Sequence, residues 1–458
     1  MKPDILPVFS KCSVRVSQLY PEPQHALRLW ATYMENVNPV LKLLHTPTAQ
    51  STIIGTILDP QASNSSSMAL AFAVFFAAVT SMNDREARES LLENRQHLLR
   101  RYSAGLNQAL VDGDYLGNPK VTELQALTIF VTCLRAHDTS RAVWVLIGTT
   151  IRLAQSIGLH RDGMLLKLCP FETEIRVRLW WHLCLLDSRS PEDHGFELTL
   201  DIFNQGPRLP LNVNDNQLYP DMKALPEGSE VWTEMTFFLV QIEAAKILHP
   251  VLRTKQDSGT DALGDLMTKR QMIADHVRLI EDRYLSNGNM DIPLHRAAFY
   301  HYHTACEKMR FMLQLREELY LQPNKISDNP DHVVRQSFTM AYRVLEGSYF
   351  LLTKDCSMHF TWIFHVYTQW YALAYVLRCL SFYPRCRETD LAWDLVNKIL
   401  RLIDSFGDGY WNGSSTSETN SIWACLEALR MQAVQRRLKG KRPQNCTMSL
   451  LQQFHRAL

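Results

Sequence analysis

The chain has 458 residues, of which 46% are hydrophobic and 21% charged, and its formal net charge is +1 at pH 7. That length can bury a large core, in one big helical domain or two fused ones, and a neutral chain lacks the basic face expected of a nucleic-acid-binding domain. Ten cysteines are spread singly, which does not indicate a disulfide framework, and no signal peptide precedes them. The longest apolar run, 68–79, is too short for a bilayer, which takes about 20 residues. We therefore expect a soluble intracellular protein.

Helical periodicity begins close to the N-terminus. Residues 1–23 are rich in proline and show no periodicity, so we expect a flexible lead-in. From residue 24 onward, Leu27, Trp30 and Met34 recur at helical spacing. Residues 68–82 are apolar all round, which predicts a buried helix.

Two amphipathic helices, joined by a loop near 160–170, are predicted in the middle of the chain. In the first, Val143, Ile147 and Ile151 fall on one face. Ser140 is a candidate N-cap, and Gly158 stands where a left-handed residue ends a helix.

The second helix of this pair is expected to begin at Pro170, since the missing N–H costs nothing at the first helical position. Glu174 and Arg178 are one turn apart, which predicts an exposed ion pair, and Arg176 lies within stacking reach of Trp180. The inner stripe of this helix is predicted to comprise Ile175, Leu179, His182 and Leu186.

The same segments resemble the central regulatory domain of fungal binuclear zinc-cluster transcription factors. The resemblance is carried by RLAQSIGLHRDG (152–163) and EIRVRLWW (174–181), although Val177 replaces the middle one of three arginines that the family usually has. It implies a large all-α domain. The matching residues are Arg152, Gly158, His160, Arg161, Glu174, Arg176, Arg178, Trp180, Trp181, Asp187 and Gly195.

The resemblance extends to other parts of the chain and implies its organisation. The helix near residue 24 and the Pro- and Asn-rich loop 209–222 also match the family, and little strand signal is found elsewhere. We expect an all-α fold in which residues 254–264 form a polar linker. The expected parts are a lead-in (1–23), the regulatory domain (24–253), a helical continuation of that domain (265–435) and a basic tail (436–458).

The zinc-cluster finger of this family is not found in the sequence. A binuclear cluster needs six thiolates that open with a C-x-x-C pair, and this chain contains no such pair. Only Cys12 precedes the regulatory resemblance, so we expect no direct DNA binding from this chain alone. Cys379 and Cys386 lie seven residues apart on one predicted aromatic helix, and we interpret them as ordinary thiols.

Enzyme and metal motifs are weak. His295, His301, His303 and Glu307 cluster in a predicted helix, which we interpret as a polar face with satisfied histidines rather than a metal site. No hydrolase elbow, phosphate loop or dinucleotide fingerprint occurs. We predict no catalytic residue, no metal and no cofactor.

One aromatic stretch, residues 360–383, is predicted to be a continuous helix. Its polar side chains within aromatic walls suit a small, largely apolar metabolite, although a well-packed core helix explains the same pattern. The candidate pocket residues are Trp362, His365, Gln369, Trp370 and Arg378.

Three hypotheses of function follow. The leading one is a finger-less transcription regulator, located in the nucleus or alternatively in the cytoplasm. It would act through other transcription factors or co-regulators, or sense a small-molecule effector. By analogy with the family, it would control a specialised-metabolite gene cluster. Arg436 and Arg437 belong to a basic end that suits nuclear import or a solvated helix terminus equally well. The alternatives are a cofactor-free cyclase or isomerase of specialised metabolism, and a fragment of a full zinc-cluster factor.

Overall fold

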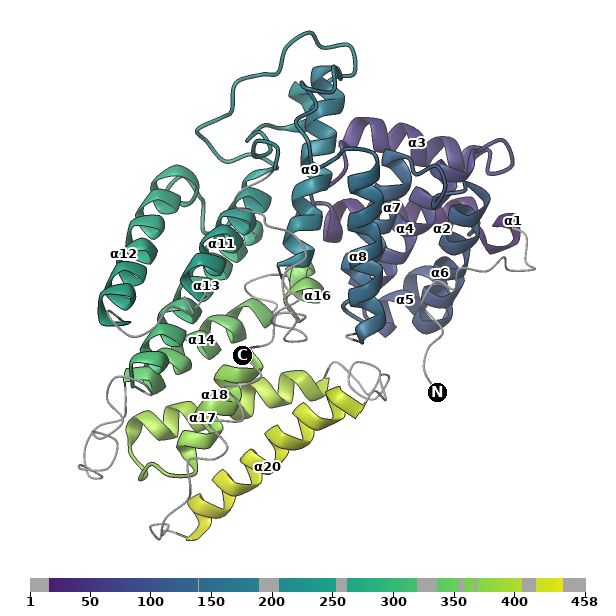
Figure 1. The fold of residues 1–458 in the computed structure, drawn as a ribbon. Helices are drawn as coiled ribbons and strands as arrows, with labels where there is room; N and C mark the ends of the chain where they lie inside the picture. The colour runs from purple at the N-terminus through teal and green to yellow at the C-terminus, as the bar shows by residue number, and fades with distance from the viewer. Residues whose placement is uncertain are drawn as a thin grey trace. The chain divides into compact units, whose positions relative to one another are not determined.

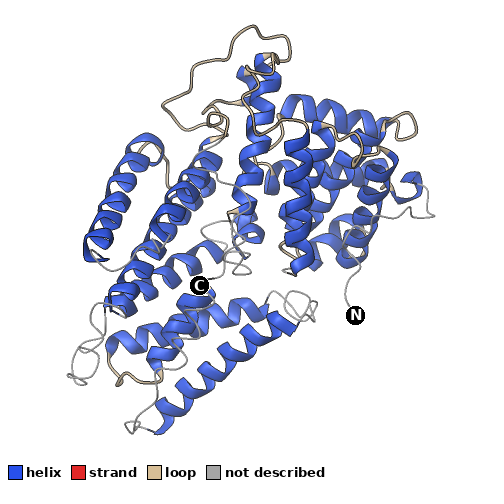
Figure 2. Ribbon diagram, viewed as in Figure 1, coloured by secondary structure: helices blue, strands red, loops and turns tan. Residues whose placement is uncertain are grey.

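The computed structural model describes residues 16–138, 140–188, 206–252, 262–318, 336–353, 358–365, 369–405 and 417–439. Within these ranges every regular element is a helix and none is a strand (Figure 2). The predicted all-α fold is therefore confirmed. The chain divides into two compact units: unit 1 is Met1–Ile242 with His359–Val366, and unit 2 is Glu243–Met358 with Tyr367–Leu458.

Unit 1 contains most of the N-terminal helices (Figure 1). They are α1 (Val16–Leu19), α2 (Pro23–Thr32), the π-helix η1 (Tyr33–Val37), α3 (Thr46–Leu58), α4 (Ser65–Ser81), α5 (Asp84–Leu91), α6 (Arg95–Asp112), α7 (Val121–Leu134), α8 (Arg141–Ser156), α9 (Pro170–Asp187), the 3-10 helix η2 (Asp215–Gln217) and α16 (Thr361–Phe364). Helix α11 (Thr236–Leu252) runs from unit 1 into unit 2.

The centre of unit 1 is α4, which packs against α6 and α7 and also meets α2 and α3 (Figure 1). The sequence predicts a helix that is apolar all round, and Phe72, Phe75 and Phe76 are fully buried on it. Gly105 lets α6 come close, because a Cβ atom at that position would collide with the Phe72 ring. The helix begins at Asn64, whose side chain accepts a hydrogen bond from the Ser67 N–H at 2.9 Å.

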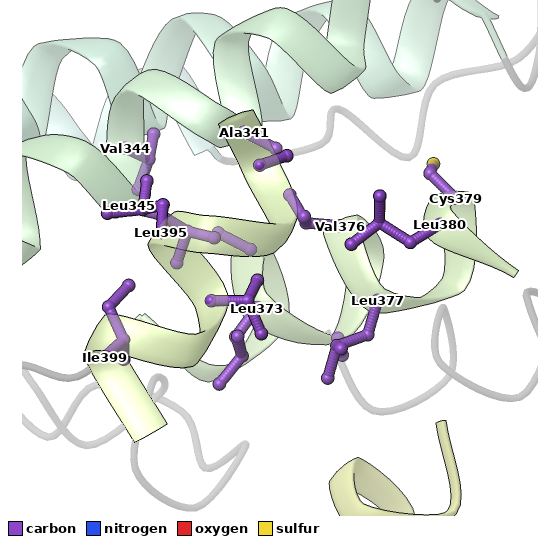
Figure 3. Close-up of a cluster of buried hydrophobic side chains, with 14 of the residues drawn as sticks. Ala341, Val344, Leu345, Leu373, Val376, Leu377, Cys379, Leu380, Leu395 and Ile399 are labelled. Atoms are coloured by element: carbon purple, nitrogen blue, oxygen red, sulfur yellow. The ribbon is translucent and has the colours of Figure 1, made fainter. Parts of the chain in front are cut away.

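Unit 2 contains the remaining helices. Its described elements are α12 (Ala262–Ile280), η3 (Glu281–Leu285), α13 (Pro293–Arg316), α14 (Gln336–Leu352), α17 (Trp370–Leu380), α18 (Arg387–Ser405) and α20 (Ser417–Lys439). The 3-10 helix η6 (Met358–Phe360) falls on the division, with Met358 in unit 2 and its other two residues in unit 1. In the core close-up, Val344 of α14, Leu373 and Leu377 of α17 and Leu395 of α18 point into one cluster (Figure 3). Burial of this apolar surface is what holds these helices together.

The prediction of one continuous helix over 360–383 is wrong. The stretch contains a short helix, α16, and a separate helix, α17, which begins at Trp370. The first part of the stretch belongs to unit 1, where the indole Nε1 of Trp362 donates to the carbonyl of Asn36 at 2.9 Å, and α17 belongs to unit 2. Cys379 lies on α17 and Cys386 precedes α18, so these two cysteines do not share a helix.

The C-terminal basic segment starts on a helix. Helix α20 extends to Lys439, so the last turn of this helix contains Arg436 and Arg437, the first residues of the predicted tail. Arg437 pairs with Asp390 of α18, and its guanidinium lies 5.2 Å from the centre of the Trp393 ring. None of the helices that the structure describes combines the length and the apolar character that a membrane crossing requires.

Candidate functional site

The predicted helical pair forms as α8 and α9. Gly158 has φ +77°, the left-handed conformation predicted for it. Its N–H donates to the carbonyl of Gln155, and the Leu159 N–H donates to that of Ala154, each at 3.0 Å. These two bonds satisfy carbonyl groups at the end of α8. Ser140 occupies the N-cap position, but its side chain makes no capping bond.

The loop between the helices is held against the start of α9. A Cβ atom on Gly163 would lie 2.5 Å from the Thr173 hydroxyl, so only glycine allows this approach. Pro170 is the first residue of α9, as predicted, and the Cys169 sulfur accepts the N–H of Glu172 at 3.5 Å. The two ends of the loop are therefore fixed by local backbone chemistry.

Glu174 and Arg178 form the predicted ion pair, with 3.3 Å between Oε1 and Nε. The prediction that this pair is exposed is wrong, because both side chains are 0% exposed. The segment that follows α9 covers them: the Leu211 N–H donates to Glu174 Oε1 at 3.0 Å, and Arg208 Nη2 lies 2.7 Å from Glu174 Oε2.

Asp215 connects this pair to a distant part of the chain. Its Oδ1 lies 2.6 Å from Arg178 Nη1, and its Oδ2 lies 2.6 Å from the Nζ of Lys42, a side chain that is 2% exposed. The backbone N–H of Thr46, at the start of α3, donates to the same oxygen at 2.7 Å. Lys42 also pairs with Glu234 at 2.6 Å.

These contacts define one ion network of three cations and three carboxylates, buried at its centre, whereas the outer members Arg208 and Glu234 are 31% and 47% exposed. Charges taken out of water are tolerated in a protein when each one is paired and hydrogen-bonded. The network joins the turn before α3, the middle of α9, and the segment 206–234. Its members are Lys42, Glu174, Arg178, Arg208, Asp215 and Glu234.

The cations of the network act on the ionisation of Asp215. Burial alone would raise the pKa of this carboxyl group, but the adjacent Arg178 and Lys42 charges hold its pKa well below the ordinary value. Asp215 is therefore ionised at neutral pH. The stability that it contributes is present above the ordinary carboxyl pKa and is lost as the pH falls through the lower, folded-state pKa.

His182 continues the same face of α9, two turns after Glu174. Its ring stacks on Phe238 of α11 with 3.7 Å between the ring centres and an interplanar angle of 8°. Burial lowers the pKa of His182 to about 3, and the Arg178 charge adds to this, although a hydrogen bond with the Lys42 backbone opposes it. The imidazole is therefore neutral, and its Nε2 meets no hydrogen-bond partner among the residues that the structure describes.

The two tryptophans of the motif lie on α9 and are both buried. The Trp181 indole donates to the backbone carbonyl of Arg208 at 2.9 Å, which holds the covering segment a second time. The Trp180 ring faces His160, with ring centres 5.8 Å apart. Burial lowers the pKa of His160, and the charge of Arg161 lowers it further.

Arg176 joins α9 to the end of α8 and does not stack on Trp180 as predicted. Its Nε donates to Glu172 at 3.0 Å, one turn earlier, and its Nη1 donates to the carbonyl of Ile157 at 3.0 Å. Trp180 meets an imidazole ring instead of the predicted guanidinium.

The remaining motif residues are dispersed. Arg152 is exposed and bonds Gln155 at 3.1 Å, and Arg161 is exposed in the loop. Asp187 is 1% exposed at the end of α9. Gly195 lies outside the described residues.

The five candidate pocket residues fall in two different units. Trp362 and His365 belong to unit 1. Burial lowers the pKa of His365 to about 4, and the Arg95 charge adds to the shift.

The other three pocket residues, Gln369, Trp370 and Arg378, belong to unit 2. Gln369 is the N-cap of α17 and accepts a hydrogen bond from the Tyr371 hydroxyl. The Arg378 guanidinium lies 4.1 Å from the centre of the Phe382 ring. The ligand pocket stays a prediction.

The histidine cluster of α13 is engaged in pairs. His303 lies 3.4 Å from Glu281, and Glu307 pairs with Arg310 at 2.6 Å. In the part of the chain that the structure describes, no group of three or more His, Cys, Asp or Glu side chains is placed to hold a metal ion.

Sequence reasoning missed Lys42 and Asp215. Lys42 follows the first predicted helix, and Asp215 lies in the loop 209–222. Nothing in the sequence around either residue shows that its side chain belongs to the ion network of α9. A charged residue inside an otherwise apolar turn, as Lys42 is in VLKLL, was the available signal.

Comparison with known proteins identifies similar chains. Residues 30–267 match the family described as fungal specific transcription factor domain. The aurofusarin cluster transcription factor aurR2 of Gibberella zeae is 29% identical over 85% of this chain and 58% of its own length. Transcriptional regulator AacuB of Aspergillus aculeatus is 28% identical over 86% and 54%, and the pyriculol/pyriculariol biosynthesis cluster transcription factor 1 of Pyricularia oryzae is 28% identical over 84% and 52%. The chain thus spans little more than half the length of these curated relatives.

A solved structure has the same fold. The K. lactis CBF3 core aligns with a TM-score of 0.58 over 94% of this chain and 89% of that chain, at 12% sequence identity. This likeness concerns the arrangement of helices only. The family match covers more than half of the 458 residues and includes all six members of the ion network. This chain therefore belongs to the fungal specific transcription factor domain family.

Proposed function

We propose that this chain is the helical regulatory part of a transcription regulator that acts in the nucleus and controls a specialised-metabolite gene cluster. The observation that carries the proposal is the family match over residues 30–267, together with relatives that are named as cluster transcription factors.

The ion network supports a structural role for the charged residues of the motif. Glu174 and Arg178 are completely buried and paired with each other, and Arg178 is also bonded to Asp215, so these charged groups serve the fold. His182 is neutral and stacked on Phe238.

We propose that DNA is contacted by a polypeptide segment other than these residues. These 458 residues contain no C-x-x-C pair from which a zinc-cluster finger opens. The proposal is therefore that the chain acts through partner proteins, either a DNA-binding factor or a co-regulator.

The test is a deletion strain analysed for both transcripts and metabolites. We expect a coherent set of biosynthetic genes to fall or rise together, and the corresponding product to change with them. Reintroducing the wild-type gene should restore both. If all transcripts stay unchanged while one pathway intermediate accumulates, the proposal is wrong and an enzymatic role replaces it.

A second measurement separates the partner hypothesis from a longer native protein. An antibody against this chain is used on extracts of the native strain. A band near 52.9 kDa supports action through partners. A considerably larger band supports a zinc-cluster factor of which these residues are one part.

A further inference from the structure

Three consecutive apolar side chains project into solvent between α8 and α9. Met164 is 64% exposed, Leu165 81% and Leu166 37%; we call these three residues the 164–166 knob. Single exposed leucines are ordinary on protein surfaces, whereas a run of three marks a contact surface. No role in the fold explains the exposure of Leu165.

The knob is rigid. The Asp162 carboxylate accepts the Met164 N–H at 2.9 Å, and the Leu165 N–H donates to the Asp162 carbonyl at 3.1 Å. The Leu166 N–H donates to the carbonyl of Gly163, which is itself packed against α9. A surface that is already ordered loses little conformational entropy when it binds a partner.

Two exposed cations flank the knob, beside the half-buried carboxylate of Asp162. Arg161 and Lys167 are exposed on either side of it, and neither has an acidic partner among the residues that the structure describes. The nearby acids are engaged: Asp162 bonds the loop backbone, and Glu172 pairs with Arg176 at 2.9 Å. A complementary surface must therefore carry carboxylates around an apolar centre.

We propose that the 164–166 knob is a docking surface for an acidic amphipathic segment of a partner protein. Apolar side chains of that segment cover Met164 and Leu165, and its carboxylates pair with Arg161 and Lys167. This inference rests on the proposed action through partner proteins, and it names the chemistry of the partner and the place where it binds.

A membrane surface is the competing occupant, and the charges argue against it. Lipid-binding basic clusters typically contain about four to eight Lys or Arg residues. The knob has two flanking cations, with the Asp162 carboxylate between them. A short peptide with matched carboxylates fits this arrangement better than an extended anionic surface.

The test uses the full chain and a fluorescent synthetic peptide that is designed as an amphipathic helix. Leu and Phe lie on one face of this helix, and Asp lies on the other. Two control peptides are used, one with Ser at every apolar position and one with Asn at every Asp position. Fluorescence anisotropy should show binding of the amphipathic peptide that weakens as salt is added, and each control peptide should bind at least about tenfold more weakly.

The variants assign that binding to the knob. Leu165→Ser should weaken binding about tenfold, because a buried leucine contributes roughly that factor. Arg161→Gln should weaken binding and reduce its salt dependence. Leu58→Ser is the matched control, since Leu58 is equally exposed, at 79%, on the end of α3.

Each outcome decides the proposal. It is overturned if Leu165→Ser and Leu58→Ser bind the peptide equally well, or if the peptide without acids binds as tightly as the acidic one. Co-sedimentation of the chain with phosphatidylserine vesicles, lost in Leu165→Ser, would replace the protein partner with a membrane. Thermal unfolding of each variant tests whether the fold is retained. These binding results do not depend on the transcript profile of the deletion strain, so failure of the docking proposal and failure of the proposed function can be told apart.

Discussion

Arg178 and Asp215, 37 residues apart, form a hydrogen-bonded ion pair with 2.6 Å between Nη1 and Oδ1, and both side chains are almost completely buried. The pair attaches the segment after α9 to the middle of that helix. Since α9 carries the Trp-Trp motif, this contact explains why a charged residue stands in the most apolar part of the motif.

Removing one charge from this pair should be strongly destabilising. Arg178→Met removes the cation that lies between Glu174 and Asp215 and leaves three carboxylates with the two cations Lys42 and Arg208. Because the lost charge is completely buried, we expect a loss of about 3–5 kcal/mol in the free energy of unfolding. Urea denaturation measures the change. Arg85→Met is the control, because the Arg85–Glu89 pair is exposed and should contribute about 0.5 kcal/mol or less. Equal effects of the two variants would contradict the buried network.

His182 should make stability depend on pH. Its pKa is about 3 in the folded protein and 6.5 as an ordinary value. Between these values the unfolded chain binds the proton and the folded chain does not, so stability falls as the pH is lowered from 6.5, by up to about 1.4 kcal/mol per pH unit.

The variant His182→Leu tests this dependence. Buried His137 also has a lowered pKa and contributes to the wild-type slope, so the informative quantity is the difference between the two proteins. Unfolding free energies measured from pH 7 down to pH 5 should decline less steeply in the variant. The difference in slope corresponds to about one proton fewer taken up on unfolding. Parallel curves would show that His182 is protonated to the same extent in both states.

Two glycines, one inside α8 and one just after its end, should respond to alanine in opposite directions. Gly158→Ala forces a side chain into φ +77° and should cost about 1 kcal/mol. Gly148→Ala, inside the helix with nothing within 4 Å of the added methyl group, should stabilise the protein by about 0.5–1 kcal/mol. Thermal unfolding measures both. A loss in Gly148→Ala would mean that the helix surface there is occupied.

Trp362 should stabilise unit 1 through its indole N–H. Trp362→Phe keeps the aromatic ring but leaves the buried Asn36 carbonyl without its donor, which should cost about 1–3 kcal/mol. Urea denaturation measures the loss. A cost below about 0.5 kcal/mol would show that water replaces the indole at this carbonyl.

Local chemistry was predictable from the sequence. The left-handed Gly158 and the helix start at Pro170 depend only on residues a few positions away, and both are found where they were expected. The i, i+4 spacing of Glu174 and Arg178 likewise predicted their pairing.

Tertiary relationships were not predictable in the same way. The burial of Glu174 and Arg178 depends on Asp215 and Lys42, which lie far along the chain. The aromatic stretch 360–383 satisfies every local criterion for one helix. It is nevertheless divided between the two units, and Trp362 in its first part bonds Asn36, a residue 326 positions away.

The ion network sets the smallest piece of this domain that can fold alone. A polypeptide that stopped at the end of α9 would contain every residue of the helical pair, yet Arg178 would keep only Glu174, and Lys42 would lose both Asp215 and Glu234. Such a fragment would have to expose α9 to water or collapse around the unpaired charge of Lys42. The segment 206–218, irregular in appearance, is therefore as much a part of the folding unit as the helices it covers.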